Sequence, residues 1–501
     1  MGSVVTARVR RSAAAVVTAS AVAVSAVLAG GGHAAAAEGS LEGSTVGSSI
    51  VTQGPVQPGA VDPFYDTSGV APSRVGEILR TQPAPYSGIL GNGSPGLPTS
   101  VDKIMYTTED ADGKLTPVTG YVLEPTVPWH GEGPRPTVVI VRGTVGQGDH
   151  CAPSRNWPLD GQPDPVYTGR TVNLEGNYDM MYASQGVRVV VTDLIGMGTP
   201  GLHTYMNRKD QAHAMLDAAR AARELVESRG GQFGKVAVYG HSQGGGASAA
   251  AAEAQPEYAP DVNLVASYAS APPADLIKVQ DNIDGSDLSG VIGFAVNGLM
   301  ARYPELAEIF DANVSPAGRD ALEKVTNMCT DDIMREYDGV YTREWITGNR
   351  TLGELAQEYP AAQRAIDDQF IGNGAPQVPV MIVSGRYDQN VAYDQAKVLA
   401  RAWCAKGVPV VYRDDILPAI ATYNHVAQAV SGGAFGIPFV IDAFHGRMPA
   451  QPTVCTNFDG NLGSSAADLS SAVSSLPLSS GFVPGGVETG LSSGTQGSGR
   501  L

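Results

Sequence analysis

The sequence contains few cysteines and few basic residues. After residue 30, no segment is expected to be long and apolar enough to anchor the chain in a membrane. It has 33 Lys and Arg against 50 Asp and Glu, a net charge of −17. This acidity argues against nucleic acid and anionic membrane surfaces as partners. No internal repeat is evident. The four cysteines are scattered, whereas metal sites use closely spaced pairs, so no metal is predicted.

The N-terminus carries the features of an export signal. Residues 1–37 contain three arginines, Arg8, Arg10 and Arg11, then an apolar run over 13–30 and four alanines at 34–37. This order is typical of a secretory signal peptide. The run is Ala-rich and shorter than the ~20 strongly apolar residues that a membrane anchor needs. Arg10-Arg11 suggests twin-arginine export, but the apolar residues expected next are missing, so general secretion is favoured and the mature protein is predicted to be extracellular.

The remaining chain is long enough for one large α/β domain or for two domains. Short apolar runs typical of strands buried on both faces alternate with helical patterns such as 209–229, which predicts a mostly parallel sheet flanked by helices. The predicted strands are 137–141, 187–192, 235–239, 263–268, 378–383 and 408–412. Residues 62–271 and 377–455 are expected to form the two parts of this core.

Three other regions interrupt or flank the core pattern. Residues 272–376 are predicted to form an inserted helical cap, with helices at 287–302 and 313–328. Residues 38–61, rich in Gly, Ser, Thr and Pro, are expected to be a flexible lead-in, and residues 456–501 a disordered Ser/Gly-rich tail.

The most informative motif is Gly240-His241-Ser242-Gln243-Gly244, which follows an apolar strand and precedes a small-residue helix. This context predicts a nucleophile elbow, in which Ser242 stands on a sharp turn and the two glycines allow the strand and helix to approach closely. The same G-x-S-x-G spacing at 490–494 has neither strand nor helix around it and is interpreted as chance. A Gly-rich turn without a chemical role is the alternative for the first copy.

A nucleophilic serine needs a histidine base and a carboxylate that orients it, and both follow the elbow in this type of fold. Asp388 comes directly after the strand at 378–383 and is the predicted acid, with a helix N-cap as the plain alternative. Only two histidines follow it, and His425, after the last strand, is preferred as the base. Asp394, Asp414, Asp415 and His445 are the rejected candidates. Asp394 is interpreted as a helix-surface position, Asp414 and Asp415 as positions in a polar loop, and His445 as the polar flank of an amphipathic helix. His241 is expected to have a packing role, with its side chain pointing away from the substrate.

Two backbone donors would complete such a site by binding the oxyanion. Gln243 follows the nucleophile, and Thr144 lies in the Gly-rich loop after the strand at 137–141. For Thr144, a turn without a chemical role is the alternative.

An even number of cysteines in an exported chain predicts two disulfides. The four residues allow three pairings, of which we favour Cys151–Cys329 and Cys404–Cys455. The first would tie the loop that carries Thr144 to the cap, and the second would close the segment that carries His425.

Several motifs in order resemble the secretory lipase family of yeasts and actinobacteria. They include Gly143-Thr144, Cys151-Ala-Pro-Ser154, Asp193-Leu-Ile-Gly-Met-Gly198, the elbow, Gly385-Arg-Tyr-Asp388, His425 and Cys455, and the resemblance covers roughly residues 69–455. It implies an α/β-hydrolase fold with an inserted cap, hydrolysis of acylglycerols and other carboxylic esters, the triad Ser242, Asp388 and His425, and oxyanion donors at Thr144 and Gln243. The chain departs from the family at Asn424, where an Asp commonly precedes the catalytic His.

The predicted function is that of a secreted serine ester hydrolase, of triacylglycerol lipase type, that acts on a lipid or ester substrate without metal or cofactor. A short-chain esterase or acyltransferase with the same triad, and less so a secreted serine peptidase, are alternatives, because fold does not fix chemistry. A binding protein without activity is the alternative of another class. The sequence leaves acyl-chain length and oligomeric state open.

Overall fold

The computed structural model describes residues 51–52, 62–86, 98–159 and 174–447. The predicted signal peptide and tail lie outside these residues, as does most of the predicted lead-in.

A ten-stranded sheet forms the centre of the described structure, with the strand order β1-β2-β3-β4-β6-β5-β7-β8-β9-β10. The strands from β6 to β10 pair in parallel, whereas β2, β3, β4 and β6 pair as antiparallel neighbours. Their bounds are β1 Val51–Thr52, β2 Ile78–Pro83, β3 Pro98–Glu109, β4 Leu115–Pro125, β5 Thr137–Val141, β6 Arg188–Thr192, β7 Val236–His241, β8 Leu264–Ser270, β9 Val380–Ser384 and β10 Val410–Asp414.

The six predicted strands are all present, with ends that differ from the prediction by no more than two residues. The central ones are buried on both faces, as their continuous Val and Ile runs predict. The prediction missed β2, β3 and β4. In β3, for example, Asp102, Lys103 and Thr107 lie on either side of an apolar run of only three residues, which is too short to mark a strand.

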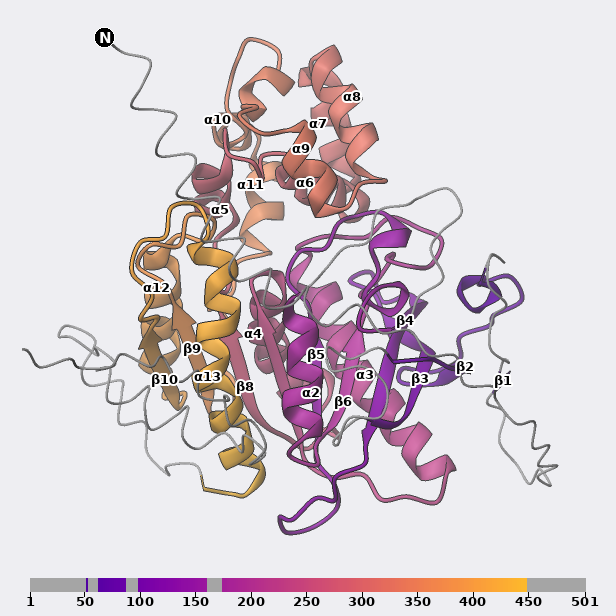
Figure 1. Cartoon of the computed structure of the whole chain (residues 1–501). Coiled ribbons are helices and arrows are strands. Elements are labelled where there is room, and N and C mark those ends of the chain that lie inside the picture. The colour runs from indigo at the N-terminus through magenta and orange to yellow at the C-terminus, as the bar shows by residue number, and fades with distance from the viewer. Residues whose placement is uncertain (1–50, 53–61, 87–97, 160–173, 448–501) are drawn as a thin grey trace, which may run out of the picture.

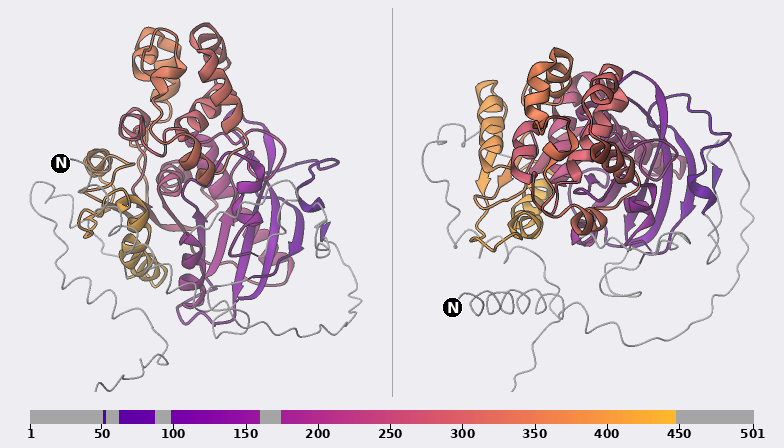
Figure 2. Two further views of the ribbon diagram at one scale, coloured as in Figure 1. Left: turned by 45° about the horizontal axis from the view of Figure 1, so that its top comes forward. Right: turned by 90° about the horizontal axis from the view of Figure 1, so that it is seen from above.

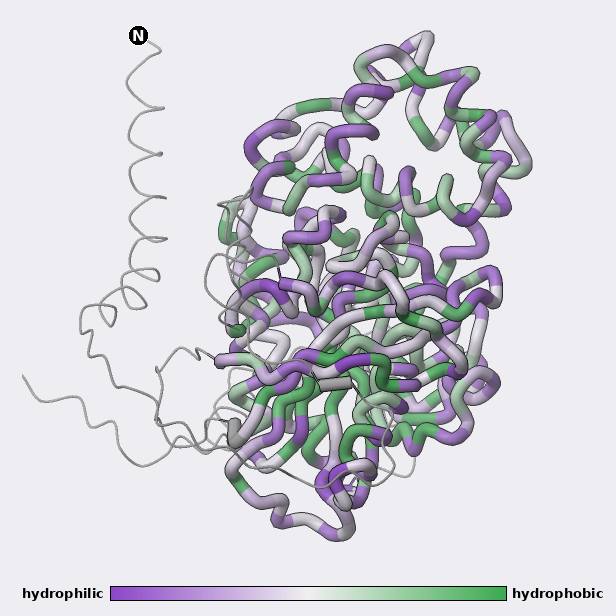
Figure 3. Tube along the Cα trace, turned by 90° about the vertical axis from the view of Figure 1, so that its right-hand side faces the viewer, coloured by the Kyte–Doolittle hydropathy of each residue, from purple (hydrophilic) through white to green (hydrophobic). Residues whose placement is uncertain are grey.

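Helices cover both faces of the sheet (Figure 1). On one face, α3 (Arg208–Ser228), α4 (Gln243–Tyr258) and α12 (Tyr393–Ala405) pack on the strands through their small and apolar residues. On the other face lie α2 (Asn177–Ala183) and α13 (Asn424–Phe444). Hydrophobic residues, green in Figure 3, are concentrated along these strands and the helices against them.

A group of helices between β8 and β9 stands beyond the carboxyl ends of the parallel strands (Figures 1 and 2). We call residues 276–367 the cap. Its helices are α5 Leu276–Ile283, α6 Val291–Arg302, α7 Pro304–Asn313, α8 Pro316–Val325, α9 Thr330–Glu336, α10 Leu352–Glu358 and α11 Pro360–Asp367. They share an apolar cluster of their own that includes Phe294, Val325 and Trp345.

The helix predicted over 313–328 is present as α8, but it is shorter than predicted and runs from Pro316 to Val325. Asn313 ends α7, and Ser315 begins α8 by accepting a hydrogen bond from the N–H of Gly318 at 3.1 Å, with Pro316 in the first turn. A Ser before a Pro is a strong helix start. The other predicted cap helix begins at Val291 rather than at residue 287.

The last helix, α13, is continuous from Asn424 to Phe444 and contains Pro438. His425 lies in its first turn, and His445 directly follows its last residue. α13 is long and apolar enough to cross a membrane, which was not predicted from the sequence. Of its most apolar 18-residue segment, 56% is buried inside the protein. Such burial is typical of a core helix.

Candidate active site

Ser242 lies between β7 and α4 in the conformation of a sharp elbow. Its backbone has φ +57° and ψ −123°, a region that side chains disfavour. The two glycines of the motif are sterically required. A Cβ at Gly240 would lie 2.2 Å from the carbonyl carbon of Gly244, and a Cβ at Gly244 would lie 2.0 Å from the carbonyl oxygen of Val141. Strand and helix therefore cross with no space for side chains, and the hydroxyl of Ser242 points away from the sheet edge.

Ser242, His425 and Asp388 form one hydrogen-bonded chain. Nε2 of His425 lies 2.8 Å from Oγ of Ser242, and Nδ1 lies 2.8 Å from Oδ2 of Asp388. The other oxygen of Asp388 accepts from the N–H groups of Asn390 and Val391, both at 2.9 Å. Burial opposes ionisation of Asp388, but the charge of His425 and these hydrogen bonds outweigh it and lower the pKa of the carboxyl. The carboxylate is therefore held ionised behind the imidazole.

The rejected acids lie elsewhere. Asp394 is exposed in the first turn of α12. Asp414 accepts hydrogen bonds from Arg386 at 2.8 Å and from Tyr393 at 2.5 Å. Burial raises the pKa of Asp415, which favours its neutral form.

The other nearby polar residues have structural partners. His445 stacks on Trp129 at the far end of α13, with ring centroids 4.7 Å apart. His241 is buried, with Nδ1 2.9 Å from Oγ of Ser270 and its ring centroid 4.6 Å from that of His425. Burial lowers the pKa of His241 to about 3, so it is neutral and packs beside His425. Asn424 closes the preceding loop by accepting from the N–H of Ile420.

Thr144 and Gln243 flank Ser242 on two sides of one cavity. Thr144 follows β5, and its hydroxyl shares a 2.6 Å hydrogen bond with the Tyr205 hydroxyl while its carbonyl accepts from Thr330 of the cap at 2.9 Å. Gln243 is the first residue of α4, where the helix dipole favours negative charge. Its side chain lies 3.1 Å from Nε2 of His203. Both residues are thus held in place around the nucleophile.

The site also contains a buried carboxyl that the sequence analysis missed. Glu175 lies in the 3-10 helix Leu174–Gly176, and its two oxygens lie 3.0 and 3.1 Å from the backbone nitrogen of Gly143. Burial raises its pKa to about 7, against the lowering effect of Arg142, the Gly143 N–H and His425. No motif surrounds this residue in the sequence, so pattern reasoning had no signal for it.

The cavity that contains Ser242 has a volume of about 460 Å³ and extends from the triad into the cap. Its floor includes Ser242, His425 and Glu175. Its upper walls are apolar side chains of six cap helices, among them Ile277, Val291, Ala295, Leu299, Phe310, Met334, Leu355 and Ile366. Phe294 is fully buried in the apolar cluster of the cap, whereas other residues of α6 line the cavity.

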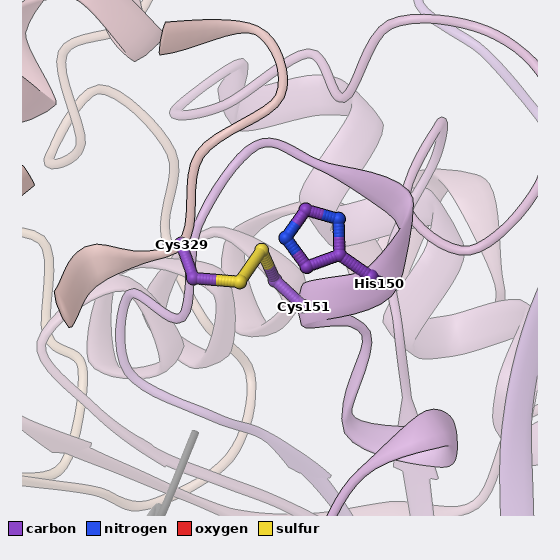
Figure 4. A group of neighbouring side chains, drawn as sticks. All are labelled: His150, Cys151 and Cys329. Carbon is purple, nitrogen blue, oxygen red and sulfur yellow. A yellow bond between two sulfur atoms is a disulfide. The ribbon is translucent and has the colours of Figure 1, made fainter. Parts of the chain in front are cut away.

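A disulfide joins the loop after β5 to the cap (Figure 4). Cys151 and Cys329 are bonded as predicted, with their Cα atoms 5.5 Å apart. The sulfurs and the His150 ring are close enough to resemble a metal site, but sulfurs bonded to each other are not thiolate ligands. The second predicted pair includes Cys455, which lies outside the described residues, so Cys404–Cys455 stays a prediction.

Comparison with known proteins gives a consistent family. A family model described as secretory lipase matches residues 169–452, more than half of the chain. A secreted triacylglycerol lipase of Malassezia furfur is 26% identical over 326 residues, 62% of this chain and 62% of that lipase. Lipase 4 of Candida albicans is 24% identical over 77% of this chain and 82% of its own length. A probable inactive lipase of Mycobacterium tuberculosis is 27% identical over 50% of this chain and 54% of its own. The matched part of this chain thus covers less than two thirds of the length of the Malassezia furfur and Mycobacterium tuberculosis relatives.

Solved structures share the fold. Candida antarctica lipase A matches with a TM-score of 0.65 and 21% identity, over 78% of this chain and 87% of that one. A rice cell wall degrading esterase of Xanthomonas oryzae matches with a TM-score of 0.59 and 19% identity, over 74% of this chain and 99% of that one. The predicted fold, an α/β-hydrolase with a mostly parallel sheet, is confirmed.

Proposed function

This chain belongs to the secretory lipase family, and we propose that it is a secreted triacylglycerol lipase that works through an acyl-enzyme on Ser242. The observation that carries the proposal is the hydrogen-bonded chain from Ser242 through His425 to Asp388, open to an apolar cavity. Secretion rests on the N-terminal pattern of residues 1–37 and on the secreted relative.

In the proposed mechanism, Oγ of Ser242 attacks the ester carbonyl while Nε2 of His425 takes its proton. The tetrahedral oxyanion is bound by the backbone N–H groups of Gln243 and Thr144. His425 then gives its proton to the leaving alcohol, and water, activated by the same imidazole, releases the fatty acid. Asp388, ionised and hydrogen-bonded to Nδ1, holds the imidazole in the required tautomer and stabilises its protonated form.

The cavity supports a long acyl chain as the substrate group. Its walls above the triad are aliphatic and aromatic side chains from α5, α6, α7, α9, α10 and α11, which would cover hydrocarbon and exclude water. A peptide substrate would leave its polar backbone against these apolar walls at a cost in free energy. The cavity therefore favours acylglycerols over peptides and over esters of short acids.

The test is a chain-length series of nitrophenyl esters beside an emulsified triglyceride and a matched amide. We expect ester hydrolysis that rises with acyl length, release of fatty acid from the emulsion, and little or no amide cleavage. Ser242→Ala and His425→Ala should lower turnover by about 10⁴-fold or more without unfolding the protein. His445→Ala is the control and should retain activity. Undiminished hydrolysis by folded Ser242→Ala would contradict the mechanism.

A further inference from the structure

Glu175 is a buried acid beside the nucleophile to which the mechanism above gives no role. It is 6% exposed, and both of its carboxyl oxygens are within hydrogen-bond distance of the Gly143 N–H. A Cβ built on Gly143 would lie 2.7 Å from Oε1 of Glu175 and 3.6 Å from Cβ of Ser242. The carboxyl group therefore lies behind the loop that leads to Thr144, within a few ångströms of the reacting serine.

A second contact fixes the backbone of Glu175. Nη1 of Arg142 donates to the Glu175 carbonyl at 2.5 Å. Arg142 and Gly143, which are consecutive, therefore both bind Glu175. Gly143 and Thr144 are consecutive, so a contact that fixes the first also restricts where the N–H of the second points. The loop after β5 and the short helix of Glu175 are in this way joined at the site.

The charged groups that face Glu175 all have other partners, and only His425 changes its charge in the proposed mechanism. Arg142 forms a buried ion pair with Asp179 of α2 at 2.7 Å, so these two charges largely cancel. Tyr178 of α2 and Tyr268 of β8 also face Glu175, and burial raises the pKa of both, so they are neutral. His425 of α13 remains as the facing group that gains a charge during turnover.

We propose that Glu175 is a positioning residue, which holds the Gly143-Thr144 backbone as an oxyanion donor and whose negative charge favours the protonated form of His425. The inference rests on the proposed function. The first part acts through geometry and needs only a hydrogen-bond acceptor at residue 175. The second part acts through charge and needs an ionised carboxyl. Glu175 ionises around neutral pH, since burial raises its pKa to about 7, so the charge is present in the alkaline half of the working range.

Two substitutions separate these parts. Glu175→Gln keeps an oxygen that accepts from the Gly143 N–H but removes the charge, whereas Glu175→Ala removes both. For a soluble nitrophenyl ester we expect Glu175→Ala to lower kcat by about tenfold or more with little change in KM, since a displaced donor weakens transition-state binding. Glu175→Gln should keep kcat within about threefold on the alkaline plateau. Its kcat/KM profile should have an acid limb shifted to lower pH by about half a unit or more.

The control is Glu253→Gln. Glu253 is likewise a buried glutamate that accepts backbone hydrogen bonds, from Gly372 and Gly374 at 2.9 and 3.0 Å, but it lies in the C-terminal half of α4, away from Ser242. Its substitution should leave the pH profile unchanged. The fraction of competent enzyme is measured in each preparation by titration with a phosphonate ester that labels Ser242, so that misfolded protein does not count as lost kcat.

Four results would overturn the inference. An acid limb that does not move in Glu175→Gln would remove the charge role, and one that moves equally in Glu253→Gln would show a general effect of losing a buried acid. A wild-type kcat in Glu175→Ala, or an equal loss in the Gln and Ala variants, would remove the positioning role. If Glu175→Ala does not fold, the Gln variant still tests the charge. Failure of the proposed function itself is distinct, because Ser242→Ala would then remain active.

Discussion

Cys151 and Cys329 are covalently joined although 178 residues separate them in the sequence. The bond lies within a set of backbone hydrogen bonds between the same two segments. The N–H of Gln147 donates to the carbonyl of Met328 at 3.0 Å, and the N–H of Thr330 donates to the carbonyl of Val145 at 2.9 Å. The core and the cap are therefore fastened together one residue away from Thr144.

Removal of this disulfide should destabilise the protein and reduce turnover. In the chain-entropy model a loop of this length contributes about 5 kcal/mol. We expect the double variant Cys151→Ser, Cys329→Ser to melt at lower temperature and to lose kcat on soluble esters, because the loop of Thr144 is less constrained. Thermal unfolding with and without reductant measures the first effect. Peptide mapping without reduction checks both predicted pairs, and a Cys151–Cys404 peptide would contradict them.

The apolar cavity makes a separate prediction about chain length. Ala295 of α6 lines the cavity, so Ala295→Trp should fill part of the acyl space and lower kcat/KM for laurate esters by about tenfold or more, with acetate esters little affected. Phe294→Ala is the matched control on the same helix. Phe294 packs in the cap cluster, so this change should cost about 3 to 5 kcal/mol of unfolding free energy while the chain-length preference is retained. An equal loss on acetate and laurate in Ala295→Trp would show that this wall is not an acyl contact.

Glu175 also predicts a pH-dependent stability. Its pKa in the folded protein, about 7, lies above the ordinary value of 4.5 because of burial. Between about pH 4.5 and pH 7 the folded state therefore binds more protons than the unfolded state. The contribution of this group to the free energy of unfolding is largest at pH values below its ordinary pKa of 4.5 and falls as the pH rises through 7. Residue 175 cannot ionise in Glu175→Gln. The Tm of this variant minus the Tm of the wild type should therefore be larger at about pH 8 than at about pH 4. A Tm difference that is the same at both pH values would contradict the assignment.

The outer face of α13 should contact the lipid substrate phase. Tyr423 and Val426 are each 50% exposed and also line the cavity, and Val430 follows one turn later at 60% exposure. No Asp, Glu, Lys or Arg occurs from 416 to 441. We expect Val430→Asp to lower hydrolysis of an emulsified triglyceride several-fold and to leave soluble butyrate ester hydrolysis unchanged, because Val430 does not line the cavity.

The control for this surface is Val398→Asp on α12, where an equally apolar side chain is 42% exposed and not part of the cavity wall. It should leave both activities intact. If Val398→Asp reduces emulsion hydrolysis as much as Val430→Asp, the effect is one of general surface charge and not of the α13 face.

Sequence alone was sufficient for the residues whose position follows from local backbone geometry. The G-x-S-x-G turn forces Ser242 out at the end of β7, and Asp388 follows β9 directly. Parallel strands end at one edge of the sheet, so chain order and strand ends predicted which serine, acid and histidine meet. The disulfide between Cys151 and Cys329 was favoured over two other pairings because it would tie the loop that carries Thr144 to the predicted cap.

The tertiary structure decided what local patterns do not encode. Glu175 has no motif around it, and its role depends on the close approach of a short helix to Gly143. The antiparallel strands β2, β3 and β4 have no long apolar run, so their pairing with one another and the pairing of β4 with β6, and not their composition, make them strands. On α6, Phe294 and Ala295 are adjacent and both apolar, yet the first is in the cap core and the second faces the cavity. A helix that is apolar on all sides does not specify which side meets substrate, because that depends on the helices packed against it.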